Sequence, residues 1–172
     1  MGFELTTGFD CRVCGEHHDT FPLSFSARAP HAAASIGPQD LERRVVISPD
    51  QCVIDNRRFF LRGRIVVPIH EREEPFIWGV WVETSPRDFL GAHALWRTPG
   101  REFTPKYRGW LNTQLPIFGN TLNLEVSVHT RQVGQRPRFL ILDKQHPLGE
   151  EQREGISLKR AQRIAEQLLH LV

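Results

Sequence analysis

The chain has 172 residues, with 22 Lys and Arg against 20 Asp and Glu, so its formal net charge is only +2. This small excess of positive charge argues against a general clamp for nucleic acids or membranes. No apolar run approaches the roughly 18 residues that cross a bilayer, and the first residues lack the basic start and long apolar stretch of a signal peptide. We therefore expect a single domain over residues 1–172, in the cytoplasm, with a protein or a small ligand as its partner.

The first part of the chain lacks a regular pattern, because glycines and prolines interrupt every candidate period. Residues 1–30 are therefore predicted to form an irregular lobe within the domain. Residues 27–38 are small and bounded by proline and glycine, which favours a loop, and a short helix is predicted from Pro38 to Arg44.

Alternating and continuous apolar patterns predict the strands. Over residues 58–69 apolar side chains alternate with arginines, which is typical of a strand with one wet face. Residues 76–82 are apolar on both faces and predict a central strand. Residues 122–128 alternate again and residues 138–142 return as a strand, so residues 121–143 are predicted to form an antiparallel hairpin.

Two helices carry signals at their N-termini. Ser85 is a predicted N-cap, with Pro86 at the first helical position. Ser157 caps a second helix, in which apolar residues recur at helical spacing up to Leu171 and Val172. Residues 99–120 connect strands through a segment rich in proline and glycine, which we expect its aromatic residues to hold in place. Runs of strands with a few flanking helices predict an α+β fold with a mostly antiparallel sheet.

A CxxCG motif is the strongest chemical signal, because a tight turn of this kind points the thiolates of Cys11 and Cys14 at one ion. Tetrahedral zinc needs four ligands, so His17 or His18 would supply a third, and Cys52 is the remaining thiol. We predict zinc as the cofactor, with Cys11, Cys14, His18 and Cys52 as the metal set.

Other interpretations of these cysteines stay open. Cys11 and Cys14 can be ordinary turn cysteines without an ion. A redox dithiol is less well supported, because no strand followed by a helix surrounds the motif. Cys52 precedes a short apolar strand, and a small buried hydrophobic residue is an equally good interpretation of it.

A second candidate site lies on the polar face of the predicted sheet. Arg62 and Arg64 on one strand, and Glu125 and His129 on another, could share one binding surface, with His146 in a loop after the next strand. The alternative is a solvated face with ordinary cross-strand ion pairs. No catalytic residue is assigned.

The sequence favours a zinc-stabilised binding module and leaves other functions open. One alternative is a small hydrolase using His129 and His146 with Asp143, which requires these groups to converge in one pocket. Another is an immunity-type protein that binds a bacterial toxin. A glycine-rich phosphate loop, a GxSxG elbow and an HExxH helix are absent from the sequence.

Several short motifs occur together between about Phe9 and the last helix. They are Cys11-x-x-Cys14-Gly15 with His18, Cys52-Val53-Ile54-Asp55, Phe59-Phe60-x-Arg62-Gly63, Phe76-x-Trp78-Gly79-Val80-Trp81-Val82, Gly109-Trp110-Leu111, Val128-His129-Thr130, Gly134-x-Arg136-Pro137, His146-Pro147-Leu148, Glu151-Gln152 and Gly155-Ile156. With this set the chain resembles an uncharacterised bacterial family of unknown function with an N-terminal CxxCG motif. The resemblance implies a small cytoplasmic bacterial domain without an assigned reaction, and it favours Cys11, Cys14, His18 and Cys52 as a set.

Overall fold

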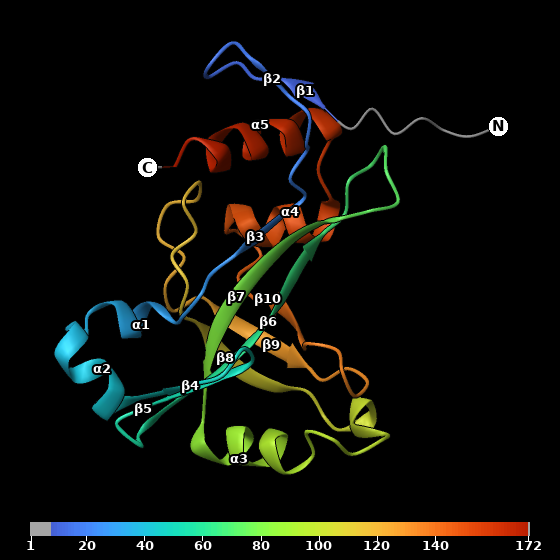
Figure 1. Cartoon of the computed structure of the whole chain (residues 1–172). Coiled ribbons are helices and arrows are strands. Elements are labelled where there is room, and N and C mark those ends of the chain that lie inside the picture. Colours follow the sequence, from blue (N-terminus) through green and yellow to red (C-terminus); the bar gives the residue numbers. More distant parts are fainter. Residues whose placement is uncertain (1–7, 172) are drawn as a thin grey trace.

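The computed structural model describes residues 8–171, so the first seven residues of the predicted N-terminal lobe lie outside it. Its elements form an α+β fold (Figure 1), which confirms the predicted class. The strands are β1 (Phe9–Asp10), β2 (His17–His18), β3 (Ser24–Ser26), β4 (Val45–Ile47), β5 (Gln51–Ile54), β6 (Arg58–Val67), β7 (Phe76–Thr84), β8 (Tyr107–Leu111), β9 (Glu125–His129) and β10 (Arg138–Ile141). The helices are α1 (His31–Ala34), α2 (Pro38–Arg44), α3 (Pro86–Ala94), the 3₁₀ turn η1 (Arg101–Phe103), α4 (Pro147–Glu154) and α5 (Leu158–Leu169).

Strands β6 to β10 form a five-stranded barrel. Each strand pairs antiparallel with the next along the chain, and β10 closes the barrel against β6 in parallel, with Arg138 opposite Arg64. Strands β5 and β4 extend the sheet beyond β6, and β3 adds to β7 in parallel. The sheet is therefore mostly antiparallel, as predicted.

The barrel encloses the main hydrophobic core. Its central members are fully buried side chains from successive barrel strands, among them Ile65, Val80, Leu111, Val126 and Phe139. This packing explains the buried glycine of β6. An ideal Cβ on Gly63 would lie 2.5 Å from Cζ of Phe139 and 2.6 Å from the carbonyl oxygen of Pro137.

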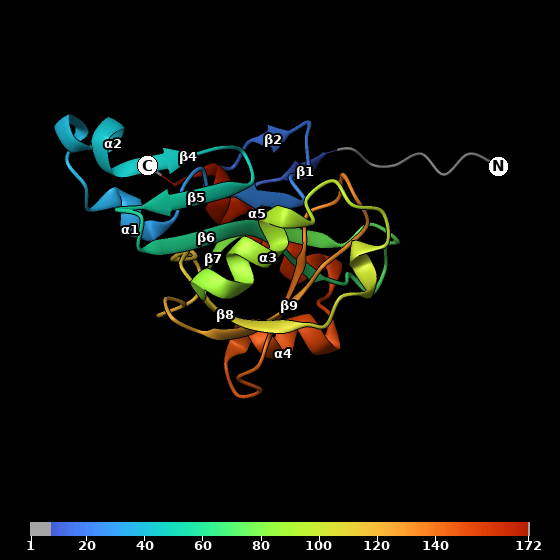
Figure 2. The same ribbon diagram turned by 90° about the horizontal axis from the view of Figure 1, so that it is seen from below.

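Helices close the two ends of this arrangement. The predicted cap of α3 is confirmed, because the Ser85 side chain accepts a hydrogen bond of 3.1 Å from the backbone N–H of Asp88. Figure 2 shows α3 lying across the barrel strands when the molecule is seen from below. Helix α5, with the β1–β2 hairpin beside it, lies at the opposite end of the molecule (Figure 1). None of the described helices is both long and apolar enough to cross a membrane.

The structure also corrects the sequence-based elements. Strand β8 lies inside the segment 99–120, which was expected to be a connection, and helices α1 and α4 were not predicted. The first strand of the predicted hairpin begins only at Glu125, because Asn123 adopts a left-handed conformation with φ of 65°. Helix α5 ends at Leu169, so Leu171 lies beyond the helix and is exposed, and Val172 lies outside the described residues.

Candidate metal centre

The CxxCG motif forms the turn of the short β1–β2 hairpin. The N–H of Gly15 donates to the carbonyl oxygen of Cys11, and the N–H of Cys11 donates to that of Glu16, each at 2.9 Å. Gly15 has a φ of 75°, in the left-handed region that glycine adopts without strain. The N–H of Val13 also donates to Cys11 Sγ at 3.4 Å.

The hairpin packs against α5, and this packing brings the two ends of the described chain together. Phe9 and Cys11 are buried in a small cluster with Ala165 of α5. The backbone N–H of Arg12 donates to Glu166 Oε1 at 3.1 Å. The C-cap residue of α5, His170, consequently lies beside the CxxCG turn.

Four side chains converge at this contact. One ligand atom from each of Cys11, Cys14, His18 and His170 lies within 4.8 Å of every other. Cys11 Sγ is 3.2 Å from His170 Nε2, and Cys14 Sγ is 3.3 Å from His18 Nε2. In tetrahedral zinc with two thiolates and two imidazoles, a sulfur and a nitrogen lie about 3.5 Å apart. The group could therefore hold a metal ion.

The surroundings of the group also favour a cation. His170 sits at the C-terminal end of α5, where the helix dipole carries partial negative charge. Cys11 is buried, Cys14 is exposed, and the two histidines are half-buried. The predicted ligands Cys11, Cys14 and His18 are thus brought together, whereas no spacing in the sequence indicates His170. His17 faces away from the group, with Nδ1 2.8 Å from Asp10 Oδ1.

Cys52 does not lie with this group. It is fully buried on β5 in a separate cluster with Ile54, Phe60 and Trp81. Burial raises the pKa of the Cys52 thiol to about 11, whereas a metal ligand must be a thiolate. Its environment is that of a small buried hydrophobic residue.

Part of the predicted binding surface forms one row across the barrel. Arg64 and His129 both stand opposite Arg138 in their neighbouring strands, so the three side chains share a face. Glu125 lies on the same face of β9 and pairs with Arg108 at 3.2 Å.

Arg62 is engaged within the protein rather than free on that face. It donates hydrogen bonds to Ser26 Oγ and to the carbonyl oxygen of Pro49, at 3.2 Å for the second. Its guanidinium carbon also lies 5.8 Å from the ring centre of Trp81. Arg62 therefore ties strand β3 and the turn between β4 and β5 to the barrel wall.

The two histidines of the hydrolase alternative lie at opposite ends of β9. His129 is opposite Arg138, whereas the N–H of Leu142, just before Asp143, donates to the carbonyl oxygen of Glu125. Four residues of extended strand separate these positions by about 13 Å. The structure does not bring His129, His146 and Asp143 into one pocket.

Each of these histidines has a local partner. His129 Nε2 lies 3.0 Å from Ser127 Oγ, and burial, with the nearby charge of Lys106, lowers the pKa of His129. His146 caps α4: its Nδ1 accepts from the N–H of Leu148 at 3.1 Å, and its Nε2 lies 3.1 Å from the carbonyl oxygen of Asn120. With both ring nitrogens bonded, His146 has a structural role.

Comparison with known proteins places the chain in one family. Neither a curated protein nor a solved structure was found to match it. Residues 10–156 match a bacterial family, and this segment contains Cys11, Cys14 and His18 but ends before His170. The chain belongs to the family described as an uncharacterized protein conserved in bacteria (DUF2199).

Proposed function

We propose that this chain is a zinc-stabilised binding domain, with Cys11, Cys14, His18 and His170 as the zinc ligands. The observation that carries the proposal is the convergence of these four ligand atoms within 4.8 Å, from a hairpin near one end of the chain and a helix end near the other. His170 is far from the other three residues in the sequence, so only the tertiary fold brings the four together. Two ordinary turn cysteines without an ion would need no such arrangement.

The ligand set favours zinc over other common ions. Two thiolates and two imidazoles suit a tetrahedral, borderline-soft ion, whereas magnesium and calcium prefer oxygen ligands. Four protein ligands also complete the coordination of zinc. A catalytic zinc keeps one position open for water or substrate, so a closed set supports a structural role.

The structural role follows from what the ligands join. The cluster between the hairpin and α5 is small, with Phe9, Cys11 and Ala165 as its buried members and Phe21 partly buried against it. So little buried apolar surface stabilises a short hairpin only weakly. A structural zinc site contributes on the order of 10 kcal/mol of apparent binding free energy, which is enough to order this lobe.

The test is the zinc content of protein purified without chelator. We expect one zinc ion per chain in the wild type and well under one in Cys14→Ser and His170→Ala. Cys52→Ala is the matched control, because it removes the third cysteine from a site outside the group. Absence of zinc from the wild type, or full zinc content in His170→Ala, would contradict the proposal.

A further inference from the structure

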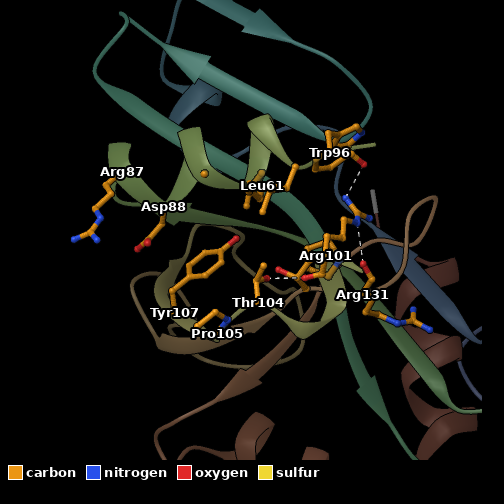
Figure 3. Close-up of a pocket in the computed structure, with 14 residues that line it drawn as sticks. Leu61, Arg87, Asp88, Trp96, Arg101, Thr104, Pro105, Tyr107 and Arg131 are labelled. Atoms are coloured by element: carbon orange, nitrogen blue, oxygen red, sulfur yellow. Dashed lines mark hydrogen bonds between the residues drawn. The ribbon is translucent and has the colours of Figure 1, made fainter. Parts of the chain in front are cut away.

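A cavity lies beside helix α3 (Figure 3). Figure 1 shows that α3 lies at the end of the molecule opposite to α5 and the β1–β2 hairpin, which hold the metal group. The cavity sits where β6, β8 and β10 begin and where β9 ends, and it is lined by Leu61, Tyr107, Thr130 and Pro137 from these positions. The remaining walls come mostly from helix α3, the η1 turn and the residues that directly follow each of them. Barrel mouths are frequent sites for small ligands.

The size and walls of the cavity limit its occupant. Its volume is about 220 Å³, larger than the about 150 Å³ of an engineered protein cavity that binds benzene. Leu61, Ala92, Leu95, Trp96 and Pro137 give it apolar walls. An occupant of this size is a single ring with one substituent, held mainly by apolar and aromatic contact.

A buried cation lines the same cavity. Arg101 is only 5% exposed, and its guanidinium carbon lies 5.1 Å from the ring centre of Trp96. In the described part of the chain its hydrogen bonds, of 2.8 to 3.1 Å, go to neutral backbone carbonyl oxygens, those of Trp96, Arg131, Gln132 and Gln135. A buried charge without an ionic partner is costly, so an anion in the cavity would complement Arg101.

The hydrogen bonds of Arg101 also leave one donor for an anion. A guanidinium has five N–H donors, and four are used in these bonds, which leaves one on Nη1. Tyr107 and Thr130 add hydroxyl groups to the lining. Burial, with the nearby charge of Asp88, raises the pKa of Tyr107 to about 12, so its hydroxyl stays protonated.

Two other charged residues, Asp88 and Arg87, lie on the rim of the cavity. Asp88 is the opposing charge, but its Oδ2 accepts a hydrogen bond of 2.9 Å from Ser85 Oγ, and it sits in the first turn of α3, where the helix dipole is positive. Arg87 is its neighbour on the rim. In Figure 3 the side chain of Arg131 points away from the cavity, and only its carbonyl group meets Arg101.

We propose that this cavity binds a small aromatic carboxylate, with the ring between Leu61 and Trp96 and the carboxylate directed to Arg101, Tyr107 and Thr130. The inference rests on the binding role proposed above but does not involve the zinc ligands. It assigns a ligand class to the barrel mouth, whereas the metal group at the other end holds the lobe in place.

The test uses three probes that share one ring and differ in charge: benzoate, benzamide and benzylamine. Binding to the zinc-loaded full chain is measured by calorimetric or NMR titration. We expect benzoate to bind about tenfold or more tightly than either of the others, a difference of about 1.4 kcal/mol. Tighter binding of benzylamine would assign the cavity to cations through Asp88, and equal or no binding of the three up to millimolar concentration would also overturn the proposal.

Two variants of α3 test whether benzoate binds inside the cavity. Ala92→Leu fills the cavity without removing a polar group, and we expect it to abolish benzoate binding. Ala94→Leu is the matched control, because Ala94 is exposed on the same helix and does not line the cavity. Unchanged benzoate binding in Ala92→Leu would overturn the assignment.

Two further variants test the hydroxyl groups. Tyr107→Phe and Thr130→Val should each weaken benzoate several-fold while leaving benzamide less affected, and thermal unfolding confirms that each variant folds. Zinc content is measured on the same samples, so a wild-type protein that holds zinc but does not bind benzoate counts against this inference alone.

Discussion

The three cysteines of the chain occupy three different environments. Cys11 is buried at the hairpin–α5 contact, Cys14 is exposed at the turn, and Cys52 is fully buried inside an apolar cluster. Thiol chemistry depends on the population of thiolate, which burial without a cationic or metallic partner suppresses. Cys52 is therefore expected to be inert toward alkylating reagents in the folded protein.

The buried Cys52 thiol makes stability depend on alkaline pH. Its pKa rises from 9.0 to about 11 on folding, because burial disfavours the charged form. Between these values the unfolded chain releases the proton and the folded chain keeps it, so stability falls as pH rises through this window. Denaturant unfolding between pH 8 and pH 11 should show a smaller loss in Cys52→Ala than in the wild type. Equal losses in the two proteins would contradict the burial argument.

His146 illustrates a histidine whose role is to cap a helix. Its Nδ1 accepts from the first turn of α4, so His146→Ala should lower the free energy of unfolding by about 0.5 to 2 kcal/mol. His146→Asn keeps a side-chain acceptor at the N-cap and should recover part of this loss. The measurement is urea denaturation, and a His146→Ala protein as stable as the wild type would disprove the capping role.

At the scale of elements, sequence patterns predict those parts of the fold whose periodicity is uninterrupted. The strands β6 and β7 and the helices α3 and α5 have clear alternation, caps or helical spacing, and they form where predicted. Strand β8 alternates too, but Gly109 stands at an inward position where a Cβ would collide with Val82, so the strand has no apolar side chain there to reveal it. Leu171 fits the apolar face of α5 in sequence, but the helix ends before it.

The sequence likewise predicts only the local part of the candidate metal site. The turn that holds Cys11, Cys14 and His18 is local, so its residue spacing indicates it. His170 joins the group only because α5 packs against the hairpin, and that contact spans almost the whole chain. Cys52 is the only other thiol, yet strand β5 carries it into a separate apolar cluster, among Phe60 and Trp81.

The glycine of β6 gives a test of barrel packing. Gly63→Ala places a methyl group against the Phe139 ring and should destabilise the protein by about 1 to 3 kcal/mol. Gly91→Ala is the control on α3, where an added methyl group meets nothing within 4 Å. Since alanine favours helix, Gly91→Ala should raise stability by about 0.5 to 1 kcal/mol. Thermal unfolding measures both, and a neutral Gly63→Ala would mean that Phe139 has room to move.

On the scale of the whole molecule, two regions differ in what stabilises them. The barrel core is large and joins residues from β6 through α5, including Trp78, Phe139 and Ile164. The hairpin contributes only a small cluster with α5. When the metal is removed, the hairpin and the end of α5 should therefore unfold locally before the barrel does.

Chelation of zinc tests this order directly. After a chelator is added, hydrogen exchange should become fast in residues 8–19 and in the last turn of α5, while β6 and β7 stay protected by the barrel core. Cys14→Ser should show the fast exchange without chelator, and Cys52→Ala should need the chelator as the wild type does. The barrel-mouth cavity should keep its affinity for benzoate throughout, because α3 and η1 lie at the other end of the molecule. Simultaneous loss of protection in β6 and β7 would instead show that the metal group and the barrel fold as one cooperative unit, and the zinc would then stabilise the whole domain rather than its N-terminal lobe.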